Sequence, residues 1–406
     1  MGSFTTQPSG AQAVYHPIKY LFDHNSTLAI ESVRAVIEFV DAPGTSFYYT
    51  IRVPYSAKTL VAGTTYKYSF NIDVSAFCKQ KLPPFTYQVS SAFRFGSTSL
   101  SNIDNGDFWG KVRITCHPEY RNAQGVLVDD TGNATSNYSN VLTASFRRSD
   151  TKNLNSYVTT STTTKFLTKR DLSSTTQTKW CLNDENSLSV FFAAKTITTS
   201  PTSEILLNWE SLDGLVGGDY VLTKNQAGQI TVGLNAIFTA ISNAGQTKFK
   251  MRIGSRTPAT TGTFSQITEW AYITLDRNCC SGTTFSWLNE LGGVDSYTFC
   301  GELETQFSVS NEYGQQYDDG LTTRLKGIYK TSSEVGEVIN VRDLLSAADL
   351  DWIKYILASH EVYVKIGAAW YNCVITDASA ITESNIEGMY DFSFTARLSD
   401  VVVNHN

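Results

Sequence analysis

A glycine pair followed by a single acid stands out in the stretch FSWLNELGGVDSYTF, residues 285–299. Such a pattern serves where backbone N–H groups hold a phosphate, where oxygens ligate a cation, or where the chain turns a corner. A phosphate site is not supported, because this stretch and LVGGDY at 215–220 lack the P-loop lysine and the G-x-G-x-x-G spacing. A cation site or a corner remains open from these residues.

Nucleophilic catalysis has few residues available to it. The chain contains five histidines and no G-x-S-x-G elbow. Cys116 and His117 are adjacent, but neighbours on a β-strand point to opposite faces and cannot form a dyad within that strand. We predict a structural cysteine beside a loop histidine, and no catalytic residues.

Metal and cofactor sites are equally poorly supported by residue spacing. Cys279-Cys280 is vicinal and has few histidines nearby, which is not a zinc pattern. The segments DNGD at 104–107 and YDDG at 317–320 have oxygen-rich turns but not the EF-hand spacing. We predict no metal and no cofactor. The cysteines are scattered and odd in number without C-x-x-C, so we predict reduced, mostly buried thiols at all seven: 78, 116, 181, 279, 280, 300 and 373.

The elements that would position any site are predicted to be β-strands. The chain has 406 residues, of which 41% are hydrophobic, 12% aromatic and only 17% charged. Ser, Thr, Asn, Gln and Gly make up the polar balance, which favours β-structure with polar faces. A net charge of −6 without a basic cluster argues against nucleic-acid binding. No apolar run approaches the ~18 residues of a membrane span and no secretion signal is recognisable, so we expect no membrane partner.

Strand signals and composition predict three modules. The fold class is mainly β, with two or three β-sandwich-like modules that each carry a short helix, and with α+β character in the C-terminal module. The expected divisions are an N-terminal β module at 1–147, a Ser/Thr-rich linker or arm at 148–180, a middle β module at 181–283, and a C-terminal β module at 284–406 with one helix at about 346–359. Ser346 is the expected N-cap of that helix.

A weak internal repeat links the three modules. In each, a strand, a short helix and a strand are followed by a strand carrying Trp109, Trp270 or Trp370. The best correspondence is KMRIG at 250–254 with YVKIG at 363–367. Three related modules would explain the pattern, and chance similarity among β-rich segments is the alternative. Seven tryptophans spread over three blocks are predicted to be core anchors rather than a carbohydrate-stacking surface.

Several motifs resemble virion structural proteins of tailed bacteriophages that infect Bacteroidetes. They are QPSGAQAVYHPIKYLFD at 7–23, RVPY followed by FNIDVSAFCK at 70–79, the aromatic-Leu-Asn-x-x-Gly-Gly-x-Asp run described above, and the C-terminal LSAADLDWIKYILASHEVYVKIGAAWYNCVITDAS. The resemblance touches both ends of the chain and the start of the third module. The Ser/Thr-rich stretch and most of the middle module match nothing in that family.

The resemblance implies a non-enzymatic component of the tail, baseplate or neck. Such a protein would assemble in the host bacterial cytoplasm, reside in the virion, and contact other virion proteins as a homo-oligomeric ring or trimer. It brings no catalytic, cofactor-binding or metal residues. In this interpretation Gly292-Gly293 turns a tight corner with positive φ, Asp295 caps or bridges that corner, and Tyr297 and Phe299 begin a core strand.

Two other functions remain as alternatives. A receptor- or glycan-binding fibre or adhesin module on the same particle, with a host surface glycan as partner, would need an exposed aromatic cluster with Asn, Asp or Gln around a cleft. A glycosidase would need two carboxylates ~5–10 Å apart, a pairing that sequence alone does not test.

Overall fold

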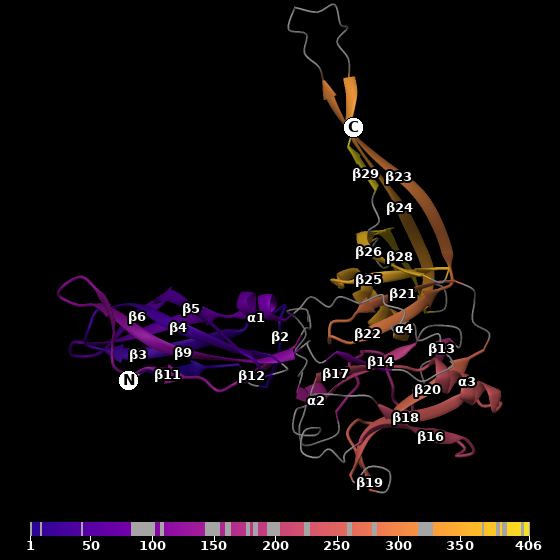
Figure 1. The fold of residues 1–406 in the computed structure, drawn as a ribbon, viewed down its shortest axis with the longest axis horizontal. Helices are drawn as coiled ribbons and strands as arrows, with labels where there is room; N and C mark the ends of the chain where they lie inside the picture. Colours follow the sequence, from indigo (N-terminus) through magenta and orange to yellow (C-terminus); the bar gives the residue numbers. More distant parts are fainter. Residues whose placement is uncertain are drawn as a thin grey trace, which may run out of the picture.

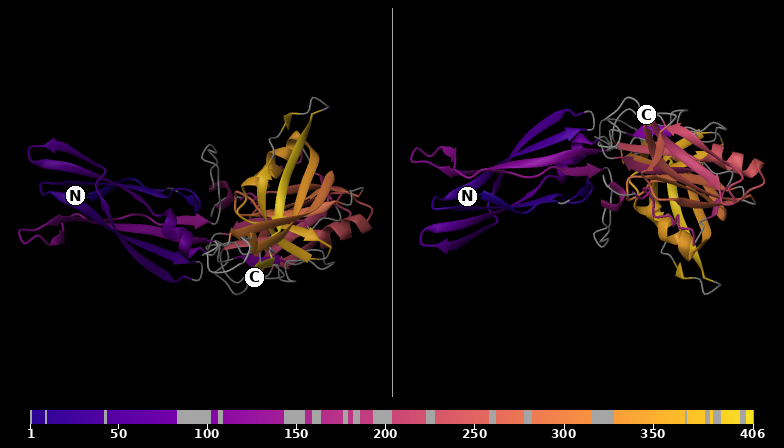
Figure 2. Two further views of the ribbon diagram at one scale, coloured as in Figure 1. Left: turned by 90° about the horizontal axis from the view of Figure 1, so that it is seen from above. Right: turned by 90° about the horizontal axis from the view of Figure 1, so that it is seen from below.

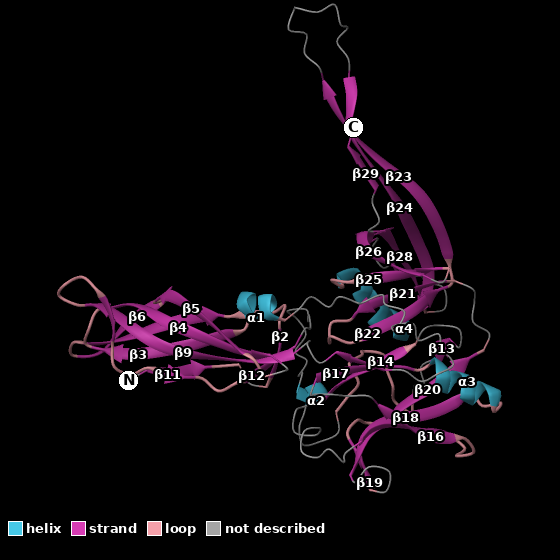
Figure 3. Ribbon diagram, viewed as in Figure 1, coloured by secondary structure: helices cyan, strands magenta, loops and turns pink. Residues whose placement is uncertain are grey.

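The mainly β prediction is confirmed: the described residues form several sheets, and their helices are short (Figure 3). The structure is a computed structural model, and it describes residues 2–8, 10–41, 44–82, 102–105, 109–142, 155–158, 164–175, 179–181, 186–192, 204–222, 228–257, 262–277, 282–315, 328–367, 369–378, 382–383, 388–398 and 402–405. The described residues form three hydrophobic cores, one in each predicted module. In the part of the chain that is described, no helix is long and apolar enough to cross a membrane.

The N-terminal module is a sandwich of two sheets with one core between them. One sheet has the order β1-β3-β7-β6, with strands Gly2–Thr6, Lys19–Ser26, Thr65–Asp73 and Ala57–Ala62. The other has the order β2-β12-β9-β4-β5, with β10 and β11 also on β9; its strands are Ala11–Ala13, Ser139–Leu142, Trp109–Arg121, Ile30–Asp41, Ser46–Pro54, Leu127–Asp129 and Ala134–Thr135. In β4, alternate apolar residues from Val33 to Phe39 face the core, as period-2 patterning requires. Helix α1, Ser75–Lys81, follows β7.

The middle module packs a six-stranded sheet and a three-stranded sheet around a second core. The larger has the order β13-β20-β18-β15-β16, with β19 on β18; its strands are Lys179–Cys181, Ala271–Asp276, Lys248–Thr257, Glu204–Ser211, Gly217–Leu222 and Thr263–Gln266. The smaller has the order β14-β17-β8, with strands Ser187–Phe192, Gly228–Gly233 and Asn102–Asn105. Helix α3, Asn235–Asn243, buries Ile237, Phe238 and Ile241 in this core.

Two segments cross the expected module limits. Strand β8 falls within the range 1–147, yet it pairs antiparallel with β17 of the middle module. In the Ser/Thr-rich range 148–180, a short helix α2 at Asn155–Val158 precedes a segment in which Phe166 and Leu172 belong to the middle core. The described part of this range therefore packs against its own chain.

The C-terminal module is one nine-stranded sheet that curls over a third core. Its order is β22-β21-β25-β26-β28-β24-β23, with β27 on β28 and β29 on β24; the strands β21 to β29 are Thr283–Leu288, Val294–Phe299, Glu302–Gln315, Ile328–Ser346, Val362–Ile366, Ala369–Ala378, Thr382–Glu383, Met389–Leu398 and Val402–His405. The helix predicted at about 346–359 is present as α4, Ala347–Ile353, continued by a 3₁₀ turn at Lys354–Ala358.

Strand pairing supports the internal repeat for the middle and C-terminal modules, where β25 and β26 take the places of β18 and β20 as predicted. In the N-terminal module the prediction was wrong in register, because β9 with Trp109 takes the place of β18 rather than that of β20. The expected strand FTYQVS at 85–90 lies outside the described residues. In the first two modules β4 and β15 each form a hairpin with the next strand and pair on their other edge with β9 or β18. The strands that follow, β12 and β20, are each flanked by a parallel strand, β2 or β13. In the third module β21 forms a hairpin with β22 and pairs on its other edge with β25, which pairs in turn with β26. In the middle module α3 precedes β18, and in the C-terminal module α4 precedes β25.

The modules are not arranged in a line. The N-terminal sandwich extends to one side of the other two modules in all three views (Figures 1 and 2). Strands β23 and β24 continue as a ribbon beyond the rest of the C-terminal sheet, away from the other modules (Figure 1).

The prediction of seven reduced thiols is wrong in part. Cys78, Cys116 and Cys373 are free and buried, as expected. Cys181 and Cys300, however, are disulfide-bonded. Cys181 ends β13 and Cys300 follows β22, so both cysteines lie at strand ends, and sequence spacing without C-x-x-C gave no sign of their bonding.

Candidate functional site

The Gly-Gly stretch forms a tight corner between β21 and β22. Gly292 has φ +84°, which confirms the predicted positive φ, and Phe299 lies in the C-terminal core as predicted. The residue that caps the corner is Asn289: its Oδ1 accepts hydrogen bonds from the backbone N–H groups of Leu291 at 2.9 Å and Gly293 at 3.0 Å. The role predicted for Asp295 was wrong, because an Asx turn uses the side chain at its start.

Asp295 holds the capping residue instead. Asn289 Nδ2 donates to Asp295 Oδ2 at 2.9 Å and to the carbonyl oxygen of Leu167 at 2.7 Å. Burial raises the pKa of Asp295 to about 6, while hydrogen bonds from Asn289 and Thr168 and the charge of Arg170 oppose the shift. The corner is thus a buried polar cluster rather than a cation site.

This corner is also the joint between the middle and C-terminal modules. A Cβ on Gly293 would lie 2.1 Å from the Leu167 carbonyl oxygen, so only glycine permits this close approach. The backbone N–H of Val294 donates to Ser189 Oγ on β14 at 3.1 Å. Leu167 in turn donates through its N–H to the Ser189 carbonyl at 2.8 Å. Three chain segments therefore meet at one buried point.

Two cationic side chains next to Leu167 strengthen the joint. The Arg170 guanidinium lies 3.8 Å from the ring centre of Trp180 in the middle module and 4.7 Å from that of Trp352 in α4. Lys169 forms an ion pair with Glu290, and both side chains are almost fully buried. Cation–π contacts of this kind are strongest when water is excluded.

A cavity of about 350 Å³ opens beside this joint. Its walls come from Tyr157 of α2, from residues 165–166 and 168–173, from Glu269 and Trp270 before β20, and from Asp351 of α4. Six of the seven tryptophans are buried, as predicted for core anchors, and Trp270 is the exception because it lines this cavity half-buried. Aromatic and ionisable side chains converge in this cavity.

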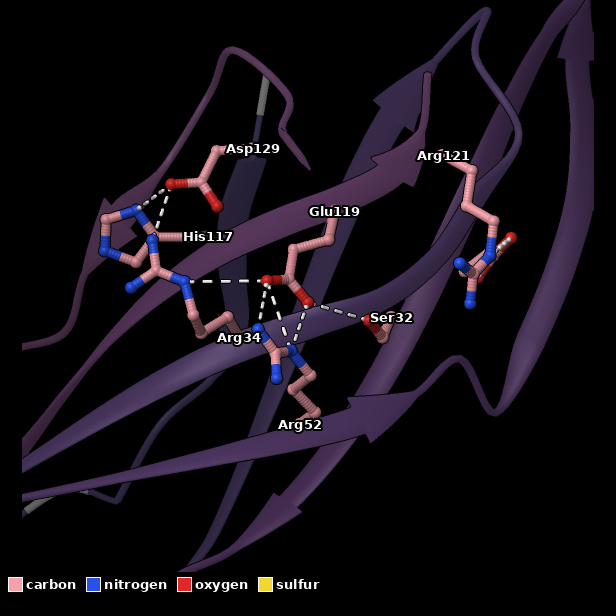
Figure 4. Close-up of polar contacts among 8 residues, drawn as sticks. Ser32, Arg34, Arg52, His117, Glu119, Arg121 and Asp129 are labelled. Atoms are coloured by element: carbon pink, nitrogen blue, oxygen red, sulfur yellow. Dashed lines mark hydrogen bonds and ion pairs between the residues drawn. The ribbon is translucent and has the colours of Figure 1, made fainter. Parts of the chain in front are cut away.

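A second polar cluster lies in the N-terminal module, on the outer face of the sheet that contains β4, β5, β9 and β10 (Figure 4). The Glu119 carboxylate accepts hydrogen bonds from Arg52 Nε and Ser32 Oγ, both at 3.0 Å, although its side chain is only 3% exposed. Arg34 lies between Glu119 and Asp129, with distances of 3.6 and 2.5 Å. Each acid is paired, so the cluster binds strands β4, β5, β9 and β10 together.

Cys116 and His117 separate as predicted. Cys116 is buried in the N-terminal core, and His117 lies on the opposite face with its Nδ1 3.6 Å from Asp129. They do not form a dyad.

The remaining sequence candidates give no site in the described residues. Gly217 and Gly218 of LVGGDY lie in β16 against Trp209, where a Cβ on Gly217 would lie 2.8 Å from the Trp209 carbonyl. Cys279-Cys280, YDDG at 317–320 and the second half of DNGD at 104–107 fall outside the described ranges. Within those ranges, no three His, Cys, Asp or Glu side chains are grouped as metal ligands would be.

Sequence reasoning missed the segment TKFLTKRDL at 164–172, which builds both the joint and the cavity. The signal was present, because three apolar residues and three basic residues lie close together inside a Ser/Thr-rich range. The Ser/Thr-rich composition of the range as a whole concealed this short apolar segment.

Comparisons with known proteins add little to this geometry. No protein-family model and no curated protein matches the chain. Among solved structures, it is similar to the crystal structure of the chicken CNTN1 FN1–FN3 domains, at 8% identity and a TM-score of 0.18, covering 80% of this chain and 88% of that one. A TM-score of this size carries no argument about function.

Proposed function

We propose that this chain is a non-enzymatic structural component of a tailed bacteriophage virion, in the tail, baseplate or neck, which assembles through repeated protein–protein contacts. The observation that carries the proposal is the β23–β24 ribbon. The two strands stay paired from Glu302–Arg342 to Gln315–Ile328, but β28 accompanies β24 only along Val338–Ser346. The rest of the ribbon extends past the sheet that covers the core.

The ribbon offers backbone for intermolecular pairing. Strand β29 covers β24 only at Ser332–Val335, and no strand in the described part of the chain pairs with the outer edge of β23. A long free edge is a template for another strand, and natural monomers usually shorten or protect such edges. β-Strand addition to a neighbouring subunit or another virion protein would use this edge.

The test is the mass of the purified full chain in solution by light scattering, together with cryo-electron microscopy of any large species. We expect closed rings or trimers. The matched variant replaces Ser310–Glu334 with Asn-Gly, which joins the register partners Val309 and Val335 through a hairpin turn. This variant is expected to be folded by circular dichroism but monomeric. A full chain that stays monomeric at every concentration, or a shortened chain that still assembles, would contradict the proposal.

A receptor- or glycan-binding module on the same particle is the second candidate function. The cavity beside Trp270 favours it, because an aromatic ring, hydroxyls and carboxylates converge there. The test is binding of the labelled full chain to host cells, with free glycans as competitors. Binding that no glycan competes with would argue against this function.

A further inference from the structure

The cavity beside Trp270 contains charges of both signs in equal number. Its lining includes three cations and three carboxylates, which are Lys165, Lys169, Arg170, Asp171, Glu269 and Asp351. A phosphate would meet three carboxylates there, and a metal cation would meet three positive charges. An apolar ligand would leave the polar groups desolvated without partners. The lining therefore favours a neutral ligand that both donates and accepts hydrogen bonds.

Most of these charges already have partners. Lys169 pairs with Glu290, Arg170 donates to the Lys179 carbonyl, and Asp351 accepts from Lys354 Nζ at 2.6 Å. Asp171 accepts from the backbone N–H of Ser173 at 2.9 Å. These bonds fix the walls of the cavity.

Three polar side chains are left without hydrogen bonds to described residues: the Tyr157 hydroxyl, the Lys165 ammonium and the Glu269 carboxylate. All three line the same cavity. Burial and then the charge of Glu269 raise the pKa of Tyr157, and Lys165 opposes the rise that burial causes in the pKa of Glu269. A phenol, an ammonium and a carboxylate together offer both donors and acceptors to a bound molecule.

Trp270 supplies a flat apolar surface next to these groups. Lys250 and Arg252 on β18 lie 4.5 and 4.2 Å from its ring centre, so the indole is held in place before any ligand arrives. A fixed ring of this kind provides contact area at little cost in conformational entropy.

We propose that this cavity binds one or two sugar rings of a neutral saccharide, with hydroxyls shared among Tyr157, Lys165 and Glu269 and one ring face against Trp270. A volume of about 350 Å³ is at the small end of ligand pockets, which limits the ligand to this size. This inference deepens the second candidate function and does not depend on the virion role.

The test is calorimetric titration of the full chain with methyl glycosides of glucose, galactose, mannose and N-acetylglucosamine, and with inorganic phosphate. At least one glycoside is expected to bind with a Kd of about 1 mM or lower. Glu269→Gln and Trp270→Ala should each weaken binding about tenfold or more. The control Glu304→Gln, a carboxylate lining a different cavity, should leave binding unchanged.

Three outcomes would overturn the proposal: no glycoside binds, phosphate binds instead, or Glu269→Gln binds as tightly as the wild type. Glu269→Gln keeps the shape of the side chain. If this variant has the circular dichroism spectrum of the wild type, unfolding does not explain a loss of glycoside binding. The variant with a shortened ribbon should bind the glycoside normally, so failure of assembly and failure of binding are distinguished.

Discussion

Asp295 is an acid enclosed in the joint between two modules, and its surroundings determine when it is charged. Burial raises its pKa from 3.8 to about 6, so the folded protein binds this proton more tightly than the unfolded chain does. The resulting stabilisation is complete below pH 3.8 and is lost as the pH rises through about 6.

We therefore expect Asp295→Asn to change how stability depends on pH. The free energy of unfolding of the variant, relative to wild type, should rise by on the order of 3 kcal/mol between about pH 4 and pH 7, since each pKa unit is worth about 1.4 kcal/mol. Urea titrations at several pH values measure this difference. A constant difference across the range would contradict the assignment.

Gly293 is needed for close packing rather than for backbone freedom. We expect Gly293→Ala to lower the free energy of unfolding by about 2 kcal/mol or more, because the new Cβ would displace the Leu167 carbonyl. The control Gly214→Ala adds a Cβ at φ +74° with nothing within 4 Å, and it should cost only about 1 kcal/mol of backbone strain. Urea unfolding of both variants gives the comparison, and equal losses would exclude the packing argument.

Among the elements, α4 is defined by its first turn. Ser346 Oγ accepts a hydrogen bond from the Asp349 N–H at 3.1 Å and donates to the Asp349 carboxylate at 2.7 Å, which confirms the predicted cap. Leu350 and Ile353 then face the core, and Trp352 stacks on Trp287 with ring centres 5.6 Å apart. The cap and the apolar face together position the helix that closes the joint.

Ser346→Ala should lower the free energy of unfolding by about 1 kcal/mol, the usual cost of losing an N-cap. Thermal unfolding monitored by circular dichroism measures the loss. Ser265→Ala is the matched control, because Ser265 is exposed on β19 and its side chain makes no hydrogen bond to a described residue. The two variants should differ, and an equal Tm would show that the cap contributes nothing.

In the whole molecule, the N-terminal and C-terminal modules meet through stacked rings. Tyr15 and His360 have ring centres 4.3 Å apart, and Lys79 of α1 lies 5.2 Å from the Tyr15 ring. Burial and the charge of Lys79 lower the pKa of both His360 and His16, while Glu361 lies close enough to act on Tyr15. The contact is therefore built for neutral histidines.

Acidification should loosen this contact. The pKa of His360 in the folded protein is below its ordinary 6.5, so the folded protein favours the neutral imidazole. The neutral imidazole therefore stabilises the fold above pH 6.5, and this stabilisation is lost as the pH falls. Hydrogen–deuterium exchange of peptides around Tyr15 and His360, corrected for intrinsic rates, should be faster at about pH 5 than at about pH 7.5. His360→Gln should reduce the difference. Equal corrected rates at both pH values would contradict the prediction.

The sequence by itself determined the local elements. Alternation of apolar and polar residues predicted the mainly β class. The N-cap Ser346 and the apolar residues that follow it predicted α4. Glycine in the corner predicted the positive φ of Gly292. These features depend on residues close together in the chain, where backbone propensity, capping and period-2 patterning act.

Only the tertiary structure decided which distant segments meet. It paired β8 with β17, placed TKFLTKRDL against the corner at Gly293, and gave the cap to Asn289 rather than Asp295. It also left Trp270 beside a cavity while the other tryptophans became buried. Each of these outcomes depends on contacts between residues far apart in sequence. The packing of such contacts, and the loop-closure entropy lost when they form, are not encoded in any local sequence pattern.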